Sequence, residues 1–272
     1  MTEREYNEAP GIRRSDLWKI RESPEKFLWA TTHETEPSPA MLFGAAAHMM
    51  VLEPDEWVSN YAIAPVVDKR TKAGKEEWER FIAENDGLTI IARDDFDTMY
   101  AMREAIRGCK LADTLLNCSG DTELPIFWTD KDTGEQCKVK LDRLIQVDGK
   151  YVVVDYKTAA NAETEEFCRS IIRFGYHVQC AMYTEAVMVE KKLNYRPDFI
   201  FVVQEKKEPY SVNVVRVSGD SNVMLYGIDT FRELIGTLHN CKALNYFPGY
   251  LGMYGEMNDA ELPPWVLVGD EE

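Results

Sequence analysis

The stretch from Lys138 to Thr158, which reads KVKLDRLIQVDGKYVVVDYKT, constrains the fold of this chain more than any other. Apolar and β-branched residues recur through Val139–Ile145 and Tyr151–Val154, as they do in two neighbouring strands. The Asp148-Gly149 pair between them is a strong signal for a two-residue hairpin turn. The sequence therefore predicts an antiparallel β-hairpin whose register is set by that turn.

Counting outward from the turn places Asp142 opposite Asp155 and Lys140 opposite Lys157, so that all four charged side chains share one face. Opposed side chains lie about 4.5–5.5 Å apart at Cβ, and like charges at that spacing are destabilising. The two carboxylates therefore need a cation, and Mg²⁺ beside a phosphate-bearing substrate is commonly held by one or two carboxylates. Lys157 is placed to orient a water molecule and to stabilise its deprotonated form for attack on phosphorus. The alternative is a surface hairpin whose charges form salt bridges without a metal.

A predicted strand at Glu123–Trp128 precedes the hairpin. If Thr129 pairs with Gln136 across the intervening turn, Glu123 lies opposite Asp142. Three carboxylates would then form a row across three strands. Otherwise Glu123 is a surface residue of an edge strand.

Four further motifs accompany the hairpin: SPEKF at Ser23–Phe27, Gly44-x-x-x-His48, RTKAGK at Arg70–Lys75, and Gln179-x-x-x-Tyr183. Together with Glu123, Asp142 and the Asp155-Tyr156-Lys157 triplet, they resemble the PD-(D/E)xK nucleases. The resemblance is to the exonuclease branch that contains the RecB nuclease domain, lambda exonuclease and RecE (exodeoxyribonuclease VIII), and it covers nearly the whole chain.

The resemblance implies an α/β, restriction-endonuclease-like core with a mixed central sheet flanked by helices. It implies a Mg²⁺-dependent DNA exonuclease, with Mn²⁺ as an alternative ion. The implied catalytic residues are Asp142, Asp155, Lys157 and Glu123. The implied metal ligands are His48, Asp142, Asp155 and the backbone carbonyl of Tyr156. The implied DNA-binding residues are Arg70, Lys72, Lys75, Gln179 and Tyr183.

Cleavage from duplex ends in the 5′ to 3′ direction, a phage or prophage recombination setting and a single-strand annealing protein as partner are expectations of the resemblance alone. Without it, His48 is a packed core histidine on a helix at Ala40–Leu52, and Asp68–Lys75 is a solvated cationic loop. The pair Gln179 and Tyr183 is then a polar stripe facing solvent.

The net charge of −16 opposes DNA binding, because nucleic-acid enzymes usually carry a basic footprint. A closed ring of subunits threaded by DNA would hold its substrate without tight contacts, and the resemblance also implies a ring-shaped homo-oligomer. The alternative is a monomer that releases its substrate after a few cuts. Two other functions stay open on the same core: a restriction-type or structure-specific endonuclease, and a non-catalytic DNA-binding relative.

The 272 residues show no linker or internal repeat, which predicts a single domain over 1–272. Six cysteines without C-x-x-C spacing predict reduced core residues and neither a zinc site nor an iron–sulfur cluster, at positions 109, 118, 137, 168, 180 and 241. Gly74-Lys75 is followed by Glu76, so no phosphate-binding P-loop and no bound nucleotide are expected. The absence of an apolar signal core or membrane-length run predicts a cytoplasmic protein with no membrane partner.

The remaining pattern predicts helices around the strands. Helical segments are expected at 15–29 with a break at Ser23-Pro24, at 93–116, from 162 with a break at Gly175-Tyr176, at 177–192 and at 222–244. A second strand pair is expected at 198–204 and 211–217. An apolar stripe of Phe96, Met99, Met102, Ile106 and Leu111 is expected to face the core, and the acidic tail after Glu261 is expected to be mobile.

Overall fold

The computed structural model describes residues 1, 3–33, 36–251, 257 and 259–261. The helices are α1 Glu3–Glu8, α2 Arg14–Glu22, α3 Pro24–Thr32, α4 Pro39–Leu52, α5 Pro54–Asn60, α6 Lys72–Glu84, α7 Arg93–Gly108, α8 Lys110–Asn117, α9 Thr164–Arg173, α10 Tyr176–Lys191 and α11 Asn222–Leu244. The strands are β1 Tyr61–Ile63, β2 Thr89–Ile91, β3 Gly120–Thr129, β4 Gln136–Val147, β5 Lys150–Ala159, β6 Asp198–Glu205 and β7 Val212–Val217. The tail beyond residue 261 lies outside the described residues.

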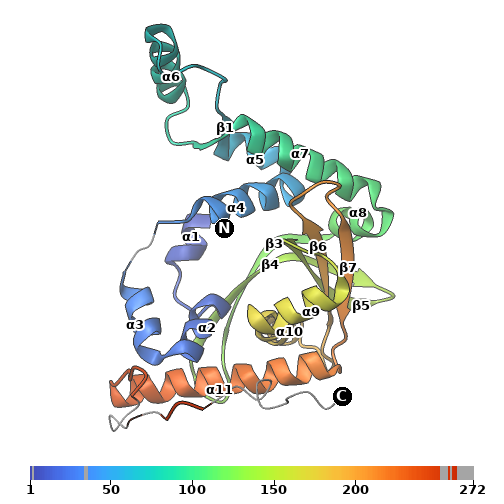
Figure 1. Cartoon of the computed structure of the whole chain (residues 1–272). Helices are drawn as coiled ribbons and strands as arrows, with labels where there is room; N and C mark the ends of the chain where they lie inside the picture. Colours follow the sequence, from blue (N-terminus) through green and yellow to red (C-terminus); the bar gives the residue numbers. More distant parts are fainter. Residues whose placement is uncertain (2, 34–35, 252–256, 258, 262–272) are drawn as a thin grey trace, which may run out of the picture.

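Five strands form one mixed sheet in the order β3-β4-β5-β6-β7. The pairs β3–β4, β4–β5 and β6–β7 are antiparallel, whereas β5 and β6 are parallel and are joined through α9 and α10. Helices lie on both sides of this sheet (Figure 1). The predicted mixed sheet flanked by helices is confirmed.

Alternation along β5 divides the core into two layers. Val153 belongs to a large cluster built with α2, α9, α10 and α11 on one face of the sheet. Val152, Val154 and Tyr156 belong to a second cluster with α4, α7 and α8 on the other face. Since successive side chains of a strand point to opposite faces, Asp155 projects with Val153 towards α10. Both faces of the strand are buried, so its position between the two helical layers is fixed.

The predicted register of both turns is confirmed. Val147 pairs with Lys150, and Thr129 pairs with Gln136. Both loop residues of the hairpin have positive φ, 50° at Asp148 and 76° at Gly149. This is the backbone that a type I′ turn requires, which is why the Asp-Gly pair fixes the register.

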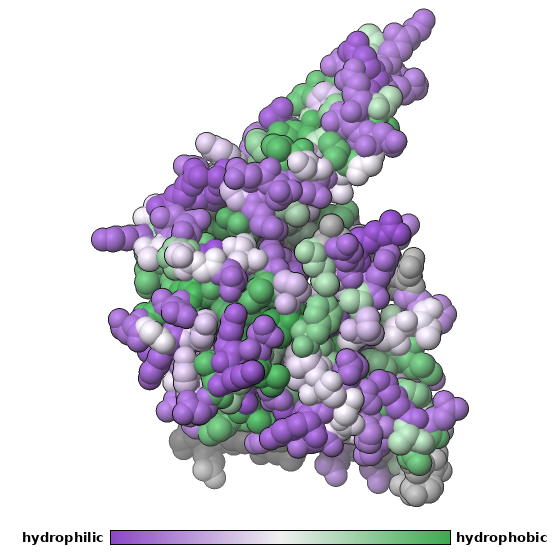
Figure 2. Space-filling view, turned by 180° about the vertical axis from the view of Figure 1, so that it is seen from behind, coloured by the Kyte–Doolittle hydropathy of each residue, from purple (hydrophilic) through white to green (hydrophobic). Residues whose placement is uncertain are grey.

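The segment that carries α6 projects from the body as an arm (Figures 1 and 2). Its base is a parallel pair of three-residue strands, β1 and β2, which were not predicted. Gly74 is the buried residue of α6. A side chain cannot be accommodated there, because a Cβ would lie 2.1 Å from the Asp68 carbonyl oxygen. The Thr71 hydroxyl caps the same turn by accepting from the Gly74 N–H at 3.0 Å. The glycine of the RTKAGK motif therefore shapes the loop.

Two expectations about burial were wrong. The segment 93–116 forms two helices, since Cys109 has an extended backbone with φ −94° and ψ 95°. This break shifts the helical phase, so Leu111 is 57% exposed while Met99, Met102 and Ile106 are buried. Cys168 is exposed, because it lies on the outer side of the amphipathic helix α9.

Candidate metal and nuclease site

The site lies where the β3–β4 ladder is interrupted at Glu123 and the β4–β5 ladder ends at Arg143–Val154. The ladder of β3 and β4 includes Thr122–Arg143 and Leu124–Leu141 but skips Glu123, whose φ is 48°. Such a backbone is rare for a residue other than glycine and costs about 1–3 kcal/mol, a cost seen mostly at functional sites. Leu141 and Leu144 both enter the same core cluster, so side-chain alternation is also interrupted beside Asp142.

The predicted pairing of Asp142 with Asp155 is wrong in one respect. The register is the expected one, but the ladder between β4 and β5 ends at Arg143–Val154, one pair short of the two aspartates. The Asp142 Oδ2 atom instead accepts from the Tyr156 N–H at 2.8 Å. The interrupted alternation turns the Asp142 carboxylate into the space between the strands, where it bridges them.

Helix α4 supplies His48 to this space. Its Nε2 atom lies 2.8 Å from Asp142 Oδ2, and its Nδ1 atom lies 3.6 Å from Glu123 Oε1. The His48 side chain is 30% exposed, which does not fit a packed core histidine. One ligand atom from each of His48, Glu123 and Asp142 lies within 4.8 Å of the others. Three residues from α4, β3 and β4 thus converge on one point.

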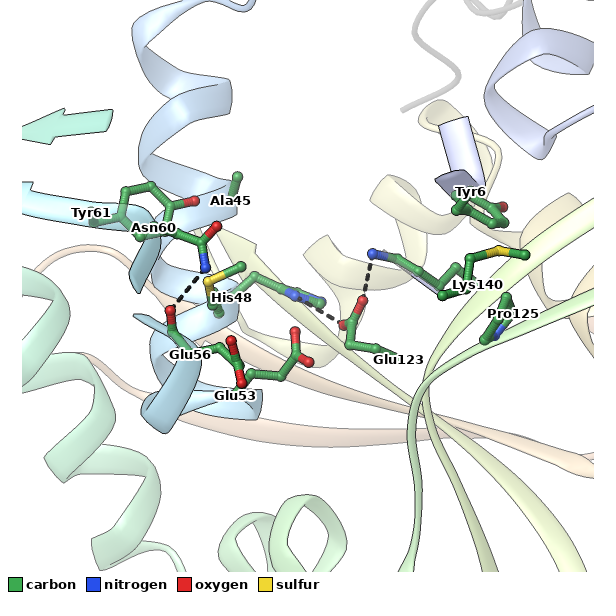
Figure 3. A pocket seen from close by; sticks show the side chains of 12 residues that line it. Tyr6, Ala45, His48, Glu53, Glu56, Asn60, Tyr61, Glu123, Pro125 and Lys140 are labelled. Atoms are coloured by element: carbon green, nitrogen blue, oxygen red, sulfur yellow. Dashed lines mark hydrogen bonds and ion pairs between the residues drawn. The ribbon is translucent and has the colours of Figure 1, made fainter. Parts of the chain in front are cut away.

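Two lysines neutralise carboxylates of the site. Lys140 Nζ lies 2.6 Å from Glu123 Oε2, and Lys157 Nζ lies 2.6 Å from Asp155 Oδ2. In Figure 3, His48 and Lys140 point towards Glu123 from opposite sides. Asp155 stands outside the three-residue group, and its Oδ1 atom accepts from Gln179 Nε2 at 2.5 Å.

The pKa values of the two aspartates are shifted in opposite directions. Burial raises the pKa of Asp155 to about 6, and the charge of Asp142 adds to this shift against the attraction of Lys157. Burial also opposes ionisation of Asp142, but His48, Lys157 and the Tyr156 N–H outweigh it and hold its pKa below the usual value. The pKa of Lys157 is raised, because the charges of Asp155 and Asp142 overcome its burial. Lys157 is therefore an ammonium ion at neutral pH.

The donor set fits a divalent cation. Glu123 Oε1 is buried without a hydrogen-bond partner among the described residues, and it faces the His48 imidazole. Burial raises the pKa of Glu123 despite the charges of His48 and Lys140, so removal from water costs this carboxylate more than its two cationic neighbours return. Carboxylate oxygens are the ligands that Mg²⁺, Ca²⁺ and Mn²⁺ prefer, and an imidazole nitrogen also suits transition-metal ions, so the set fits a divalent cation without selecting one.

The expected DNA-binding residues lie in three different places. Gln179 is 3% exposed and contacts Asp155, so it belongs to the site and does not face solvent. Tyr183, one turn later, packs in the core against Phe199 at a ring distance of 6.2 Å. The basic residues Arg70, Lys72 and Lys75 are exposed, and they belong to the arm that projects away from the sheet that carries the site (Figure 1).

The Tyr156 side chain is buried on the other face of the sheet, where its hydroxyl donates to Gln204 Oε1 at 2.7 Å. Its N–H contacts Asp142, which places the Tyr156 backbone at the edge of the site. A role for the Tyr156 carbonyl as a metal ligand stays a prediction.

Two hollows lie beside His48, and each is lined partly by residues that the sequence did not identify as site residues. One, of about 590 Å³, is lined by Tyr6, Glu53, Glu56, Glu123 and Lys140 among others. The other, of about 270 Å³, is lined by Arg14 and Tyr176 beside Lys157. Arg14 carried no sequence signal beyond a double arginine before a helix, because only the folded chain brings it to this site.

The mixed sheet, the aspartates on two adjacent strands and the lysine two residues after the second define a protein of the PD-(D/E)xK nuclease superfamily. The chain belongs to the family described as PDDEXK-like domain of unknown function (DUF3799), whose model matches residues 14–256. No described helix could cross a membrane.

The chain is similar to the crystal structure of a protein named "Putative exonuclease" from Eubacterium rectale, with a TM-score of 0.57 and 13% sequence identity. That match covers 99% of this chain and 98% of the other. A second crystal structure, of SSO0001, overlaps with a TM-score of 0.33 and 12% identity over 80% of this chain and 84% of the other, which is too low to carry an argument. No curated protein matches the sequence.

Proposed function

We propose that the protein is a metal-dependent deoxyribonuclease that degrades DNA from duplex ends. The observation that carries this proposal is the convergence of His48, Glu123 and Asp142 within 4.8 Å, beside the Lys157–Asp155 ion pair. The name of the structurally similar Eubacterium rectale protein, with its full coverage of both chains, supports an exonuclease over other nucleases of this fold.

His48, Glu123 and Asp142 would hold Mg²⁺ or Mn²⁺, with Asp155 and the Tyr156 carbonyl as further ligands. A bound divalent ion supplies Lewis-acid stabilisation of charge on the phosphate and a more acidic water. Lys157 is a cation at neutral pH, so it positions the attacking oxygen and stabilises its negative charge rather than accepting its proton. Gln179 orients the Asp155 carboxylate through its hydrogen bond.

The test is cleavage of linear and covalently closed circular duplex DNA by the purified protein, in Mg²⁺, Mn²⁺ or EDTA. An exonuclease degrades only the linear form and only with a metal. Substrates labelled at the 5′ or the 3′ end then determine the direction, which we expect to be 5′ to 3′. Asp142→Asn is the inactive control. Cleavage of the circle would favour the endonuclease alternative, and cleavage in EDTA would reject the metal site.

We also propose that the active form is a ring of several subunits. The net charge of −16 gives a monomer little electrostatic attraction to DNA, whereas a threaded ring needs a basic surface only on its inner wall. Light scattering should show a particle several times 31.2 kDa, and excess unlabelled DNA should not arrest degradation already under way. A monomer that the competitor DNA arrests at once would contradict this proposal.

A further inference from the structure

The smaller of the two hollows beside His48 differs from the larger one in charge. Arg14, Lys157, Thr158 and Tyr176 line it, whereas three glutamates and one lysine line the other: Glu53, Glu56, Glu123 and Lys140. The hollow with arginine and lysine is the one that suits a phosphate.

Arg14 is held in place by contacts that leave its charge available. Its Nη1 atom donates to the Phe174 carbonyl oxygen at 3.1 Å, and its guanidinium lies 5.9 Å from the centre of the Tyr176 ring. A guanidinium has five N–H donors, so this one bond leaves others for a ligand. In the part of the chain that the structure describes, Arg14 forms no ion pair with a carboxylate, whereas Lys140 and Lys157 each have one. An uncompensated arginine beside a metal site is notable in so acidic a protein.

Gly44 provides a second, independent observation. No heavy atom of the described residues lies within 4 Å of the position that a Gly44 Cβ would take. The glycine therefore does not serve close helix packing, although it costs α4 up to about 1 kcal/mol relative to alanine. Gly44 lines the same hollow as Arg14, one helical turn before His48. A missing side chain at this place lets a ligand backbone approach the helix closely.

We propose that Arg14 binds a backbone phosphate of the DNA strand next to the scissile phosphate, and that Gly44 leaves room for the strand at this point. This inference rests on the proposed nuclease function, since it names a subsite of the same site. Arg14 contacts the non-bridging oxygens of that phosphate.

The first test compares Arg14→Gln with Lys19→Gln, which removes the same charge from an exposed position of α2. Binding of a fluorescent duplex is measured by anisotropy in Ca²⁺ at several salt concentrations. Arg14→Gln should weaken binding about tenfold and reduce the slope of log affinity against log salt by about one. Lys19→Gln should match the parent.

The second test replaces the phosphate on either side of the scissile one by an uncharged methylphosphonate. At one of the two positions the methylphosphonate should lower kcat/KM of the parent about tenfold. The same substitution in the DNA should leave kcat/KM of Arg14→Gln unchanged, because this variant lacks the interaction that the methylphosphonate removes. A merely structural role for Arg14 would leave the two losses additive, which would overturn the inference. Gly44→Leu should keep the parent's melting temperature but raise KM, whereas Gly108→Leu, an equally open glycine at the end of α7, should not.

The outcomes separate the two proposals. A parent that cleaves DNA while Arg14→Gln keeps its affinity and salt slope overturns the phosphate subsite alone. A parent that cleaves no DNA, but binds it through Arg14, overturns the proposed function and leaves the subsite standing.

Discussion

Replacing Asp155 by asparagine should stabilise the metal-free protein, although Asp155 is a candidate catalytic residue with two polar contacts. Burial and the neighbouring Asp142 charge raise its pKa to about 6 in the folded protein, against about 3.9 in an unfolded chain. The folded protein therefore binds this proton more tightly than the unfolded chain does. The stability that the proton contributes is fully present below about pH 4 and is lost as the pH rises through 6.

The pKa difference of about 2 units corresponds to about 3 kcal/mol at pH 7.5, since one unit is 1.36 kcal/mol. Asparagine resembles the protonated acid, keeps an oxygen for the Gln179 amide and removes this penalty. The asparagine also loses the ion pair with Lys157, since its amide group carries no negative charge. The gain in the free energy of unfolding is therefore at most about 3 kcal/mol. A gain of even 1–2 kcal/mol raises the melting temperature by several degrees for a chain of this size.

Asp142→Asn is the matched comparison and should act in the opposite direction. The Asp142 pKa is lowered, because His48, Lys157 and the Tyr156 N–H overcome the effect of burial, so its ionised form stabilises the fold. Urea unfolding in EDTA between pH 4 and 8 would compare both variants with the parent. The stability gain of Asp155→Asn should grow from near zero at pH 4 to its full value above pH 7. A gain that is independent of pH, or an equal loss in both variants, would refute this account of the site.

Three further predictions concern separate parts of the molecule. His48→Ala should raise the Mg²⁺ concentration that half-maximal cleavage requires at least tenfold without unfolding the protein, and His33→Ala should not; an unchanged metal requirement would restore the packed histidine. Arg70→Ala, on the exposed arm, should change stability by less than about 0.5 kcal/mol but reduce any preference for 5′-phosphorylated over 5′-hydroxyl ends, and an unchanged preference would remove end recognition from Arg70. Gly74→Ala should open the loop at Asp68 and increase hydrogen exchange in the arm, whereas Gly108→Ala should leave exchange there unchanged; equal exchange in both would contradict the close contact.

The hairpin could be predicted from the sequence because local chemistry determines it. Asp148 and Gly149 tolerate the positive φ that a type I′ turn needs, and the apolar residues on either side then have one register. The succession of strand and helix signals predicted a mixed sheet flanked by helices, but the place of the second strand pair beside β5 came from the structure. The resemblance brought His48 and Gln179 to the site, where the structure places both beside the aspartates.

The geometry within the site could not be predicted, since it depends on contacts between distant segments. Nothing local marks Glu123 as a residue of positive φ, and nothing local marks the end of the β4–β5 ladder at Arg143–Val154. Arg14 reaches the site through the Phe174 carbonyl, 160 positions along the chain. The strands β1 and β2 are three residues each, too short for a period to be visible.

The charges of the site predict how an acidic protein can bind DNA. Without metal, Lys140 pairs with Glu123, Lys157 pairs with Asp155, and His48 lies 2.8 Å from Asp142, so each carboxylate of the site has a partner within the protein. A divalent ion held by the carboxylates would add two positive charges to this region and would weaken the ion pairs of the carboxylates with both lysines. DNA affinity should therefore depend on the metal before any bond is cut.

Ca²⁺ separates binding from cleavage, because it occupies oxygen ligands but supports phosphoryl hydrolysis poorly. The dissociation constant of a duplex end, measured by anisotropy at fixed ionic strength, should fall at least tenfold between EDTA and Ca²⁺ for the parent. The Asp142→Asn variant should show little of this change. Equal affinity of the parent in EDTA and Ca²⁺ would mean that the attraction for DNA comes from elsewhere, and the exposed basic residues of the arm would then be the place to look.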